Sequence, residues 1–337
     1  MVARGLVPGS IGNRRQRCLA RVHGGCPDRR ARIAGLHITG AGGISLSMQS
    51  VPDETLALAG DCAEAELAAL ESFVAGHRRL FVLTGAGCST RSGIPDYRDA
   101  EGGWKRTPPV TWQAFTGEAA TRRRYWARSL AGWQYFAAAR PNAAHEALAA
   151  LEAAGRVELL VTQNVDGLHQ RAGSQAVVDL HGRLDAVVCL GCGDRRDRAA
   201  FQATLLEANP GWELRVARIA PDGDADLEDA DYAGFQVPDC PHCGGMLKPD
   251  VVFFGESVPR ARVEQAVAAL HRSDAMLVVG SSLMVYSGFR FARMAAEAGI
   301  PVAAVNLGRT RADGLLALKV RADCVSALSA LAGATMQ

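Results

Sequence analysis

Two cysteine pairs form the clearest metal-binding pattern in this sequence. Cys189 and Cys192 make one C-x₂-C pair, and Cys240 and Cys243 make a second one. Four thiolates from two such pairs are the usual ligands of a structural zinc ion. They leave no coordination position for water, so the metal would stabilise the fold rather than take part in catalysis. Two disulfides or free buried thiols are the alternatives, and a reducing compartment disfavours the disulfides.

A glycine-rich turn marks a second candidate site. The stretch GAGCSTRSGIPDYR covers residues 85–98 and directly follows the apolar run Leu80–Thr84. Glycines let the backbone approach a phosphate, turn amides can donate to it, and Arg98 can add a charge-assisted contact. A dehydrogenase would need a second strand soon after this turn, ending in an acid about 20 residues beyond the glycines. That region is rich in Trp and Arg and reads as helix, so hydride transfer is disfavoured.

Short apolar runs predict the strands that position these residues. A helix is expected at 54–75, and the later strands alternate with helices at 260–272 and 287–298. The expected strands are 80–84, 157–162, 177–180, 275–280 and 301–306. Several of them end in glycine or polar residues, and the carboxyl ends of parallel strands meet at one edge of a sheet. The pattern predicts an α/β fold, with a Rossmann-like parallel sheet, helices on both faces and one shared ligand crevice.

Two segments interrupt this alternation and predict a small additional zinc-binding and helical domain. Residues 99–155 read as helical and contain four of the five tryptophans, whereas residues 186–248 contain both cysteine pairs and an acidic loop. We therefore expect a Rossmann-like NAD-binding domain formed by 48–185 and 249–337, with a helical insertion at about 99–155. Residues 186–248 are expected to form the zinc-binding module.

The first 47 residues differ from the rest in charge. They contain eight Arg, no Lys and one acid, a net charge of +7, so the remaining residues carry −5 to give the whole-chain charge of +2. The segment is Arg-rich like an organelle transit peptide but lacks the apolar region of a secretory signal. Lysine occurs only three times in the chain, which suggests a GC-rich bacterial genome. A disordered basic extension, or a start assigned upstream of Met48, therefore explains the segment better.

The motifs together resemble the sirtuin family, which comprises NAD-consuming protein-lysine deacylases. The matching stretches, in family order, are GAGCSTRSGIPDYR (85–98), TQNVDGLH (162–169), LHG (180–182), the four paired cysteines, KPDVVFFGE (248–256), GSSL (280–283) and VNLG (305–308). YWAR (125–128) and the PDGD…FQVP…LKPDVVFFG run resemble the class II branch. The resemblance implies a deacylase that consumes NAD, releases nicotinamide, O-acyl-ADP-ribose and free lysine, and holds one structural zinc ion.

The resemblance also implies roles for individual residues. His181 matches the catalytic base, which takes a proton from a ribose hydroxyl and should have a pKa near the working pH. Asn164 and Asp166 match residues that hold the nicotinamide ribose and carboxamide, and they complete the catalytic set. The expected NAD contacts are Gly85, Ala86, Gly87, Cys88, Ser89, Pro95, Asp96, Tyr97, Arg98, Gln163, Asn164, Val165, Asp166, Gly280, Ser281, Ser282, Asn306, Leu307, Gly308 and Cys324.

Two groups of residues match the substrate side of the expected site, and Cys88 beside the glycine turn has two possible roles. Tyr125 and Arg128 are spaced like the Tyr-x-x-Arg pair with which acid-specific sirtuins hold succinyl or malonyl groups, although Arg128 could instead lie on a solvated helix face. Cys88 could be a small buried filler or a thiol with a lowered pKa at a helix start. The residues that match the walls for a substrate peptide bound as an added strand are Val251, Val252, Phe253, Phe254 and Gly255.

Other functions remain open at this point. A protein mono-ADP-ribosyltransferase or a lipoamidase-type enzyme would use the same NAD site and the same residues. A zinc-and-nucleotide-binding module without activity is a third hypothesis, but the presence of His181 with Asn164 and Asp166 argues against it. Acyl-lysine proteins are the expected partners, in the cytoplasm, whereas membranes and nucleic acids are not expected. We expect a monomer or weak dimer.

Overall fold

The computed structural model describes residues 53–105, 109–210, 212, 216–219, 225–227 and 231–334. The basic extension predicted at 1–47 lies outside these residues, as does most of the predicted acidic loop. The chain divides at Leu58, and residues 59–337 form one compact unit. None of the described helices is long and apolar enough to cross a membrane.

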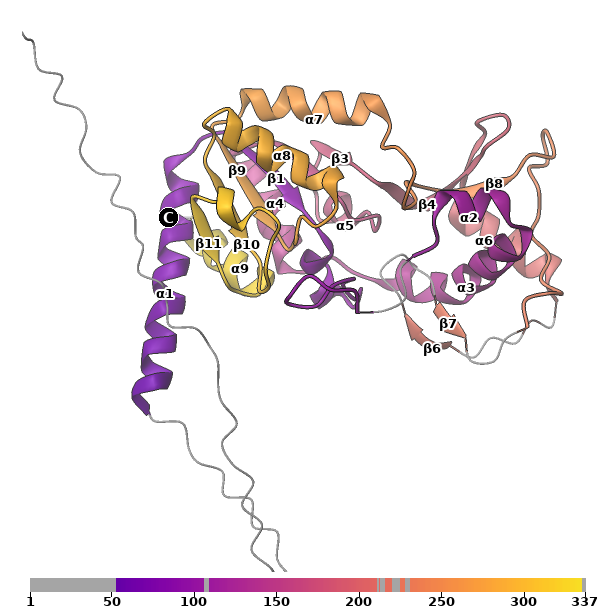
Figure 1. Cartoon of the computed structure of the whole chain (residues 1–337), viewed down its shortest axis with the longest axis horizontal. Helices are drawn as coiled ribbons and strands as arrows, with labels where there is room; N and C mark the ends of the chain where they lie inside the picture. Colours follow the sequence, from indigo (N-terminus) through magenta and orange to yellow (C-terminus); the bar gives the residue numbers. More distant parts are fainter. Residues whose placement is uncertain are drawn as a thin grey trace, which may run out of the picture. The chain divides into compact units, whose positions relative to one another are not determined.

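Six parallel strands form the main sheet (Figure 1). Its order is β11-β10-β9-β1-β2-β3, so the strand that precedes the glycine turn lies inside the sheet. Thr84 at the end of β1 is level with Thr162 of β2 and Val279 of β9, which brings three strand ends together at one edge. The bounds are β1 (Leu80–Thr84), β2 (Val157–Thr162), β3 (Val177–Asp179), β9 (Ala275–Val279), β10 (Val302–Val305) and β11 (Leu318–Val320). The predicted α/β fold with a parallel sheet is confirmed.

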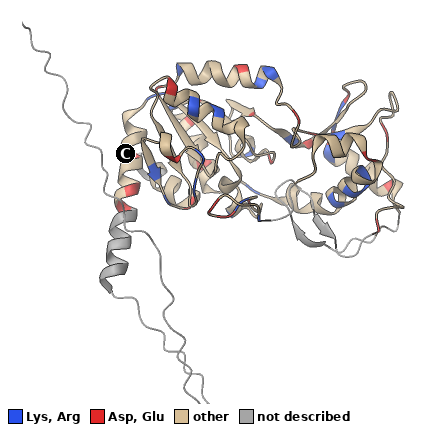
Figure 2. Ribbon diagram, viewed as in Figure 1, with Lys and Arg blue, Asp and Glu red and all other residues tan. Residues whose placement is uncertain are grey.

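Helices cover both faces of this sheet because the side chains of each strand alternate between the faces. Leu80 and Val82 pack in one apolar core with residues of α1, α4 and α9, whereas Phe81 and Leu83 pack in another core with residues of α7 and α8. Figure 2 marks lysines and arginines in blue on α7 and α8. The bounds are α1 (Asp53–Gly76), α4 (Ala143–Ala153), α7 (Arg260–Arg272), α8 (Tyr286–Glu297) and α9 (Cys324–Ala334).

The helical insertion is shorter than predicted. The described residues of 99–111 form no helix, and the helices that follow are α2 (Trp112–Gly117), α3 (Ala119–Ala138) and α4. The reason is local, since Gly102 has a φ of +90° and the Asp99 carboxylate accepts the backbone N–H of Gly103 at 2.7 Å. Such side-chain bonds to the backbone, next to glycine, favour a turn over a helix.

A second, antiparallel sheet links the crevice to the cysteines. Its order is β5-β4-β8, and β4 begins directly after His181 and ends at Cys189. Trp126 of α3 packs on Phe201 of α6 with ring centroids 4.9 Å apart, so the helical insertion and this module share one apolar core. The remaining bounds are β4 (Gly182–Cys189), β5 (Arg195–Asp197), β6 (Val216–Ile219), β7 (Ala225–Leu227), β8 (Leu247–Val251), α5 (Leu168–Arg171), α6 (Arg198–Ala208), and the short 3₁₀ turns η1 (Ala86–Cys88), η2 (Thr90–Ser92) and η3 (Asp313–Leu315). The predicted domain bounds stay predictions.

Candidate active site

A cavity of about 360 Å³ lies where several parallel strands end. The glycine turn after β1, the Gln163–Asp166 segment after β2 and the serines after β9 all contribute to its wall. The sequence-predicted residues in the lining are Gly85, Ala86, Gly87, Ser89, Asp96, Tyr97, Arg98, Gln163, Asn164, Val165, Asp166, His181, Gly280, Ser281, Ser282, Asn306, Leu307, Gly308, Cys324, Tyr125, Val251, Val252, Phe253 and Phe254. Cys88, Pro95, Gly255 and Arg128 are absent from that lining.

The glycines after β1 and β9 are needed for the two turns to pack together. Gly280 has a φ of +62°, and a Cβ placed there would lie 2.3 Å from the backbone nitrogen of Cys88. The backbone N–H of Gly87 donates to the carbonyl of Gly280 at 2.8 Å. Glycine at these positions therefore serves close backbone packing as well as access for a phosphate.

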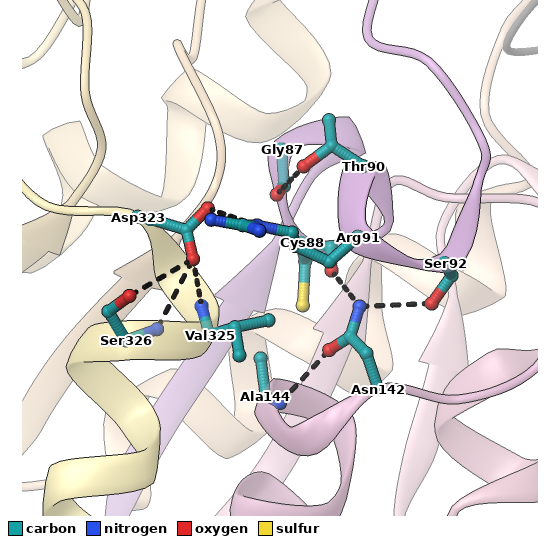
Figure 3. A network of polar contacts seen from close by, with 10 residues as sticks. All are labelled: Gly87, Cys88, Thr90, Arg91, Ser92, Asn142, Ala144, Asp323, Val325 and Ser326. Carbon is teal, nitrogen blue, oxygen red and sulfur yellow. Dashed lines mark hydrogen bonds and ion pairs between the residues drawn. The ribbon is translucent and has the colours of Figure 1, made fainter.

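Side chains from two other elements hold the glycine loop in place (Figure 3). Asn142, which caps α4, donates its Nδ2 to the carbonyl of Cys88 and to Ser92 Oγ, both at 2.9 Å. Arg91 Nε lies 3.4 Å from the carboxylate of Asp323, which in turn accepts backbone N–H groups at the start of α9. Contacts within the protein thus fix the turn conformation that a phosphate would meet.

Cys88 lies behind this loop as a filler of the core. Its side chain is fully buried, and burial raises the pKa of its thiol well above the usual value. The neighbouring Cys324 raises the pKa further. A thiol in this state is a poor nucleophile, so the structure supports the small buried filler and not the alternative of a thiol with a lowered pKa.

A connected set of hydrogen bonds joins the turns after β1 and β2. Ser89 Oγ donates to the Asp166 carboxylate at 2.7 Å, and Asn164 Nδ2 donates to Ser89 Oγ at 3.0 Å and to the Gly85 carbonyl at 3.1 Å. Gln163 Oε1 accepts a further bond from the serine hydroxyl that follows β9. The level ends of the parallel strands bring these residues together across the sheet, as the sequence predicted.

Both ring nitrogens of His181 are hydrogen-bonded. Nδ1 lies 3.0 Å from the carbonyl oxygen of Gln163, which can only accept, so Nδ1 carries the proton of the neutral ring. Nε2 lies 2.7 Å from Ser287 Oγ, which therefore donates to it. Burial lowers the pKa of His181 to about 4, against the effect of the Gln163 bond, and Arg262 and Arg290 lower it further. The pKa of His181 is therefore well below the value near the working pH that the sequence predicted. The imidazole nevertheless stays neutral, as a base requires.

Ser287 was missed by the sequence reasoning. It is buried, it lies 106 residues after His181 in the chain, and it belongs to the first turn of α8. The one signal in the sequence is that Ser287 lies shortly after Ser281 and Ser282, which follow β9.

Arg98 contacts its own loop in this structure. Its guanidinium lies 4.0 Å from the ring centroid of Trp104, and Nη1 donates to the carbonyl of Gly102 at 2.7 Å. Lys105 Nζ also pairs with the Asp96 carboxylate at 2.5 Å. Two of the predicted cofactor contacts, Asp96 and Arg98, therefore lie at the cavity while bonded to residues of the loop that follows them.

Of the two residues predicted to hold an acidic acyl group, Tyr125 lines the cavity and Arg128 does not. Tyr125 lines the cavity, and its ring packs on Phe253 with centroids 5.4 Å apart. Arg128 is half-buried, one helical turn further along α3, and does not line the cavity. The cavity wall around Tyr125 therefore includes two aromatic side chains, Tyr125 and Phe253.

The four paired cysteines meet in a cluster whose geometry suits zinc. All four Sγ atoms lie within 4.8 Å of one another, with Cys189 to Cys243 at 3.5 Å and Cys192 to Cys240 at 3.8 Å. Tetrahedral zinc with Zn–S bonds of about 2.3 Å places its sulfurs about 3.8 Å apart. The described cysteines are free thiols, which contradicts the disulfide alternative. None of the four lines the cavity, so the cluster is consistent with a structural zinc ion.

Comparison with known proteins agrees with this geometry. The Sir2 family model matches residues 85–287. The chain is 67% identical over 263 residues to an NAD-dependent protein deacetylase of Xanthomonas campestris pv. campestris (strain 8004), a match that covers 78% of this chain and 90% of the relative. It is 62% identical over 269 residues to a protein of the same name from Bordetella bronchiseptica (strain ATCC BAA-588 / NCTC 13252 / RB50), over 80% of this chain and 98% of the relative.

Solved structures give the same result. A Sir2 enzyme superimposes with a TM-score of 0.64 at 30% identity, over 81% of this chain and 100% of the other. A Sir2 complex with a p53 peptide and NAD⁺ superimposes with a TM-score of 0.62 at 29% identity, over 80% and 98%. With these matches and the cavity and cysteine cluster in place, the chain belongs to the Sir2 family.

Proposed function

We propose that this chain, an NAD-dependent protein deacetylase, binds NAD in the cavity at the strand ends and uses His181 as its general base. The observation that carries the proposal is the state of His181. Its ring is neutral, is oriented by two hydrogen bonds, and faces the cavity that the glycine turn also lines.

The residues around the cavity fit a dinucleotide. The glycine turn lets a phosphate approach the backbone closely, although the Gly85 and Gly87 amides already donate to Val279 and Gly280. Ser281, Ser282 and Asn306 offer side-chain partners for ribose or phosphate oxygens. Asn164 and Asp166 are held in place by Ser89 and would contact the nicotinamide end. When bound, NAD supplies the glycosidic bond to nicotinamide, and its ADP-ribose part accepts the acyl group.

His181 would take a proton at Nε2, because Nδ1 is committed to the Gln163 carbonyl. The single lone pair of Nε2 accepts a hydrogen bond from the Ser287 hydroxyl in this structure, so a ribose hydroxyl would have to displace that bond to give its proton to Nε2. The Ser287 oxygen can then accept from Nε2–H of the protonated ring. One hydroxyl therefore supports both protonation states without movement of the ring. We assign Ser287 a positioning role and His181 the proton transfer.

The substrate would be an acyl-lysine whose chain enters beside Phe253 and Tyr125. Structures of Sir2 proteins with a p53 peptide and with a propionylated peptide show that relatives bind such peptides. The aromatic wall favours acetyl and other uncharged short acyl groups. We assign the chain to the class II branch on its YWAR sequence at 125–128, with Tyr125 rather than Arg128 at the acyl group.

The test is to incubate the purified protein with NAD and a panel of acetyl-, propionyl-, succinyl- and lipoyl-lysine peptides, and to read products by mass spectrometry. We expect loss of the acyl group with one nicotinamide released per lysine freed. His181→Gln should lower the rate by more than about 100-fold, whereas His271→Gln, at an exposed position on α7, should match the wild type. Transfer of ADP-ribose to protein without deacylation would contradict the proposal, and so would full activity of His181→Gln.

We also propose the cytoplasm as the location and a monomer or weak dimer as the solution state. The cysteine cluster supports the first point, because free thiols that bind zinc are maintained in a reducing compartment. Cell fractionation and light scattering test the two points separately.

A further inference from the structure

Three arginines surround an exposed tyrosine at the start of α8. Tyr286 is 45% exposed, and Arg290 and Arg293 follow it at the i+4 and i+7 positions of one helix face. The guanidinium carbons of Arg290, Arg293 and Arg311 lie 5.3, 5.6 and 5.9 Å from the Tyr286 ring centroid. Arg311 also lies 4.4 Å from the ring of Phe289. We name these five residues the α8 arginine surface.

Little negative charge balances this surface. Arg293 pairs with Glu297 at 3.5 Å, but the two side chains are 47% and 65% exposed, so the pair is weak. Among the described residues, Arg290 and Arg311 have no carboxylate within 4.0 Å. Arg290 Nε is also buried without a hydrogen-bond partner. The surface therefore presents three guanidinium groups against one carboxylate.

The α8 arginine surface continues the wall of the cavity. Met284 and Val285 line the cavity and directly precede Tyr286. Arg311 Nη1 donates to the carbonyl of Met284 at 3.3 Å, and the backbone N–H of Arg311 donates to Ser282. A polypeptide whose lysine occupies the cavity would thus pass next to these arginines.

We propose that the α8 arginine surface binds acidic side chains of the substrate protein close to the acyl-lysine. The proposal rests on the deacetylase function, since it requires a peptide in the cavity. Guanidinium groups bind carboxylates with two parallel hydrogen bonds, and stacking on Tyr286 and Phe289 orients them before the substrate arrives.

An acidic polypeptide fits better than a nucleic acid. The three arginines of this surface lie on one helix and one loop, whereas residues 48–337 as a whole carry a net charge of −5. A polyanion that spans many phosphates needs an extended basic surface and would be repelled by the remainder of the protein. A few carboxylates beside one lysine match the size of the surface.

The experiment compares NAD-dependent deacetylation of three peptides that carry Asp, Ala or Lys on both sides of one acetyl-lysine. For the wild type at low salt, we expect kcat/KM to be about 5- to 10-fold higher for the Asp than for the Ala peptide, and this ratio should fall as salt is added. Arg293→Glu should reduce the ratio to about one or below, and Arg293→Lys should restore part of it. Arg140→Glu, which changes an exposed arginine outside this surface, should keep the wild-type ratio.

The outcomes separate this proposal from the function on which it rests. If the wild type does not deacetylate even the Ala peptide, the proposed function fails. If the Ala peptide reacts but the Asp peptide gains nothing at low salt, only the α8 arginine surface is refuted. Equal loss of the ratio in Arg140→Glu and Arg293→Glu would also refute it. The proposal is also refuted if a short DNA duplex binds through Arg293 while Arg293→Glu leaves the kcat/KM ratio of the Asp and Ala peptides unchanged.

Discussion

Protonation of His181 should weaken the folded protein in mild acid. Burial lowers its pKa from 6.5 to about 4 in the folded state. Between these values the unfolded chain binds a proton that the folded chain does not, so the stability contribution is complete above about pH 6.5 and is lost as the pH falls toward 4. With these two pKa values, the loss between about pH 7.5 and about pH 5 is about 2 kcal/mol.

The measurement is urea unfolding of the wild type and of His181→Gln at about pH 7.5 and about pH 5. The wild type should lose about 2 kcal/mol more than the variant between the two pH values. Burial also lowers the pKa values of His145 and His169, but both remain in the variant, so their effect cancels in the comparison. The lost hydrogen bonds of the ring lower the stability of the variant at both pH values and cancel in the same way.

Equal losses in the two proteins would show that the pKa of His181 is not depressed. Burial would then not be what keeps the His181 ring neutral. A kinetic measurement gives a second check, since the acid limb of kcat/KM for the wild type should lie well below pH 6.5. A limb centred at pH 6.5 would show that the pKa of His181 is not lowered, even if the protein were stable there.

Four further changes test separate parts of the structure. Cys240→Ala should release bound zinc and lower the melting temperature, and an unchanged metal content would remove the zinc site. Gly280→Ala should cost about 2 kcal/mol or more in urea unfolding, because it combines a positive φ with a Cβ 2.3 Å from backbone, and wild-type stability would show that the turn can shift. Ser287→Ala should lower kcat/KM about tenfold, with Ser287→Thr less affected, and an unchanged value would show that one hydrogen bond suffices to hold the ring. Arg128→Met should leave activity on a glutaryl-lysine peptide within about twofold of the wild type. A loss of activity on this peptide alone would show that Arg128 binds the acyl carboxylate.

Five of the six strands of the main sheet could be predicted, most of them because they are continuous apolar runs, whereas β11, which is three residues long, was not expected. Leu80–Thr84 is buried at every position, and a strand buried on both faces has no polar alternation to confuse its assignment. The location of the site followed from the same fact, since parallel strands place Gly85 and Asn164 at one edge. The cysteine cluster was predictable for a different reason, because zinc requires a ligand spacing that few other structures impose.

Other features depend on contacts that a linear pattern does not contain. The segment after Arg98 is rich in Trp and Arg and was expected to be helical. The Asp99 carboxylate and the positive φ of Gly102 instead favour a turn there. The pKa of His181 depends on how completely the fold buries the ring, which the Leu-His-Gly motif does not specify. Arg128 has the spacing expected of a residue that holds an acidic acyl group, and at i+3 it shares a face of α3 with Tyr125. The sequence pattern could not show that Tyr125 lines the cavity while Arg128 does not.

In the first turn of α8, a difference of one residue position decides which side chain reaches the site. Successive residues of a helix point about 100° apart, because 3.6 residues complete a turn. Ser287 is therefore directed into the protein, onto His181, while Tyr286 one position earlier is 45% exposed among the arginines. A shift of α8 by a single residue would remove the hydroxyl from the base and bury the tyrosine at the same time. The proposed support of the catalytic base and the proposed acidic-substrate surface thus depend on one helix start, which explains why a sequence motif for either is hard to recognise alone.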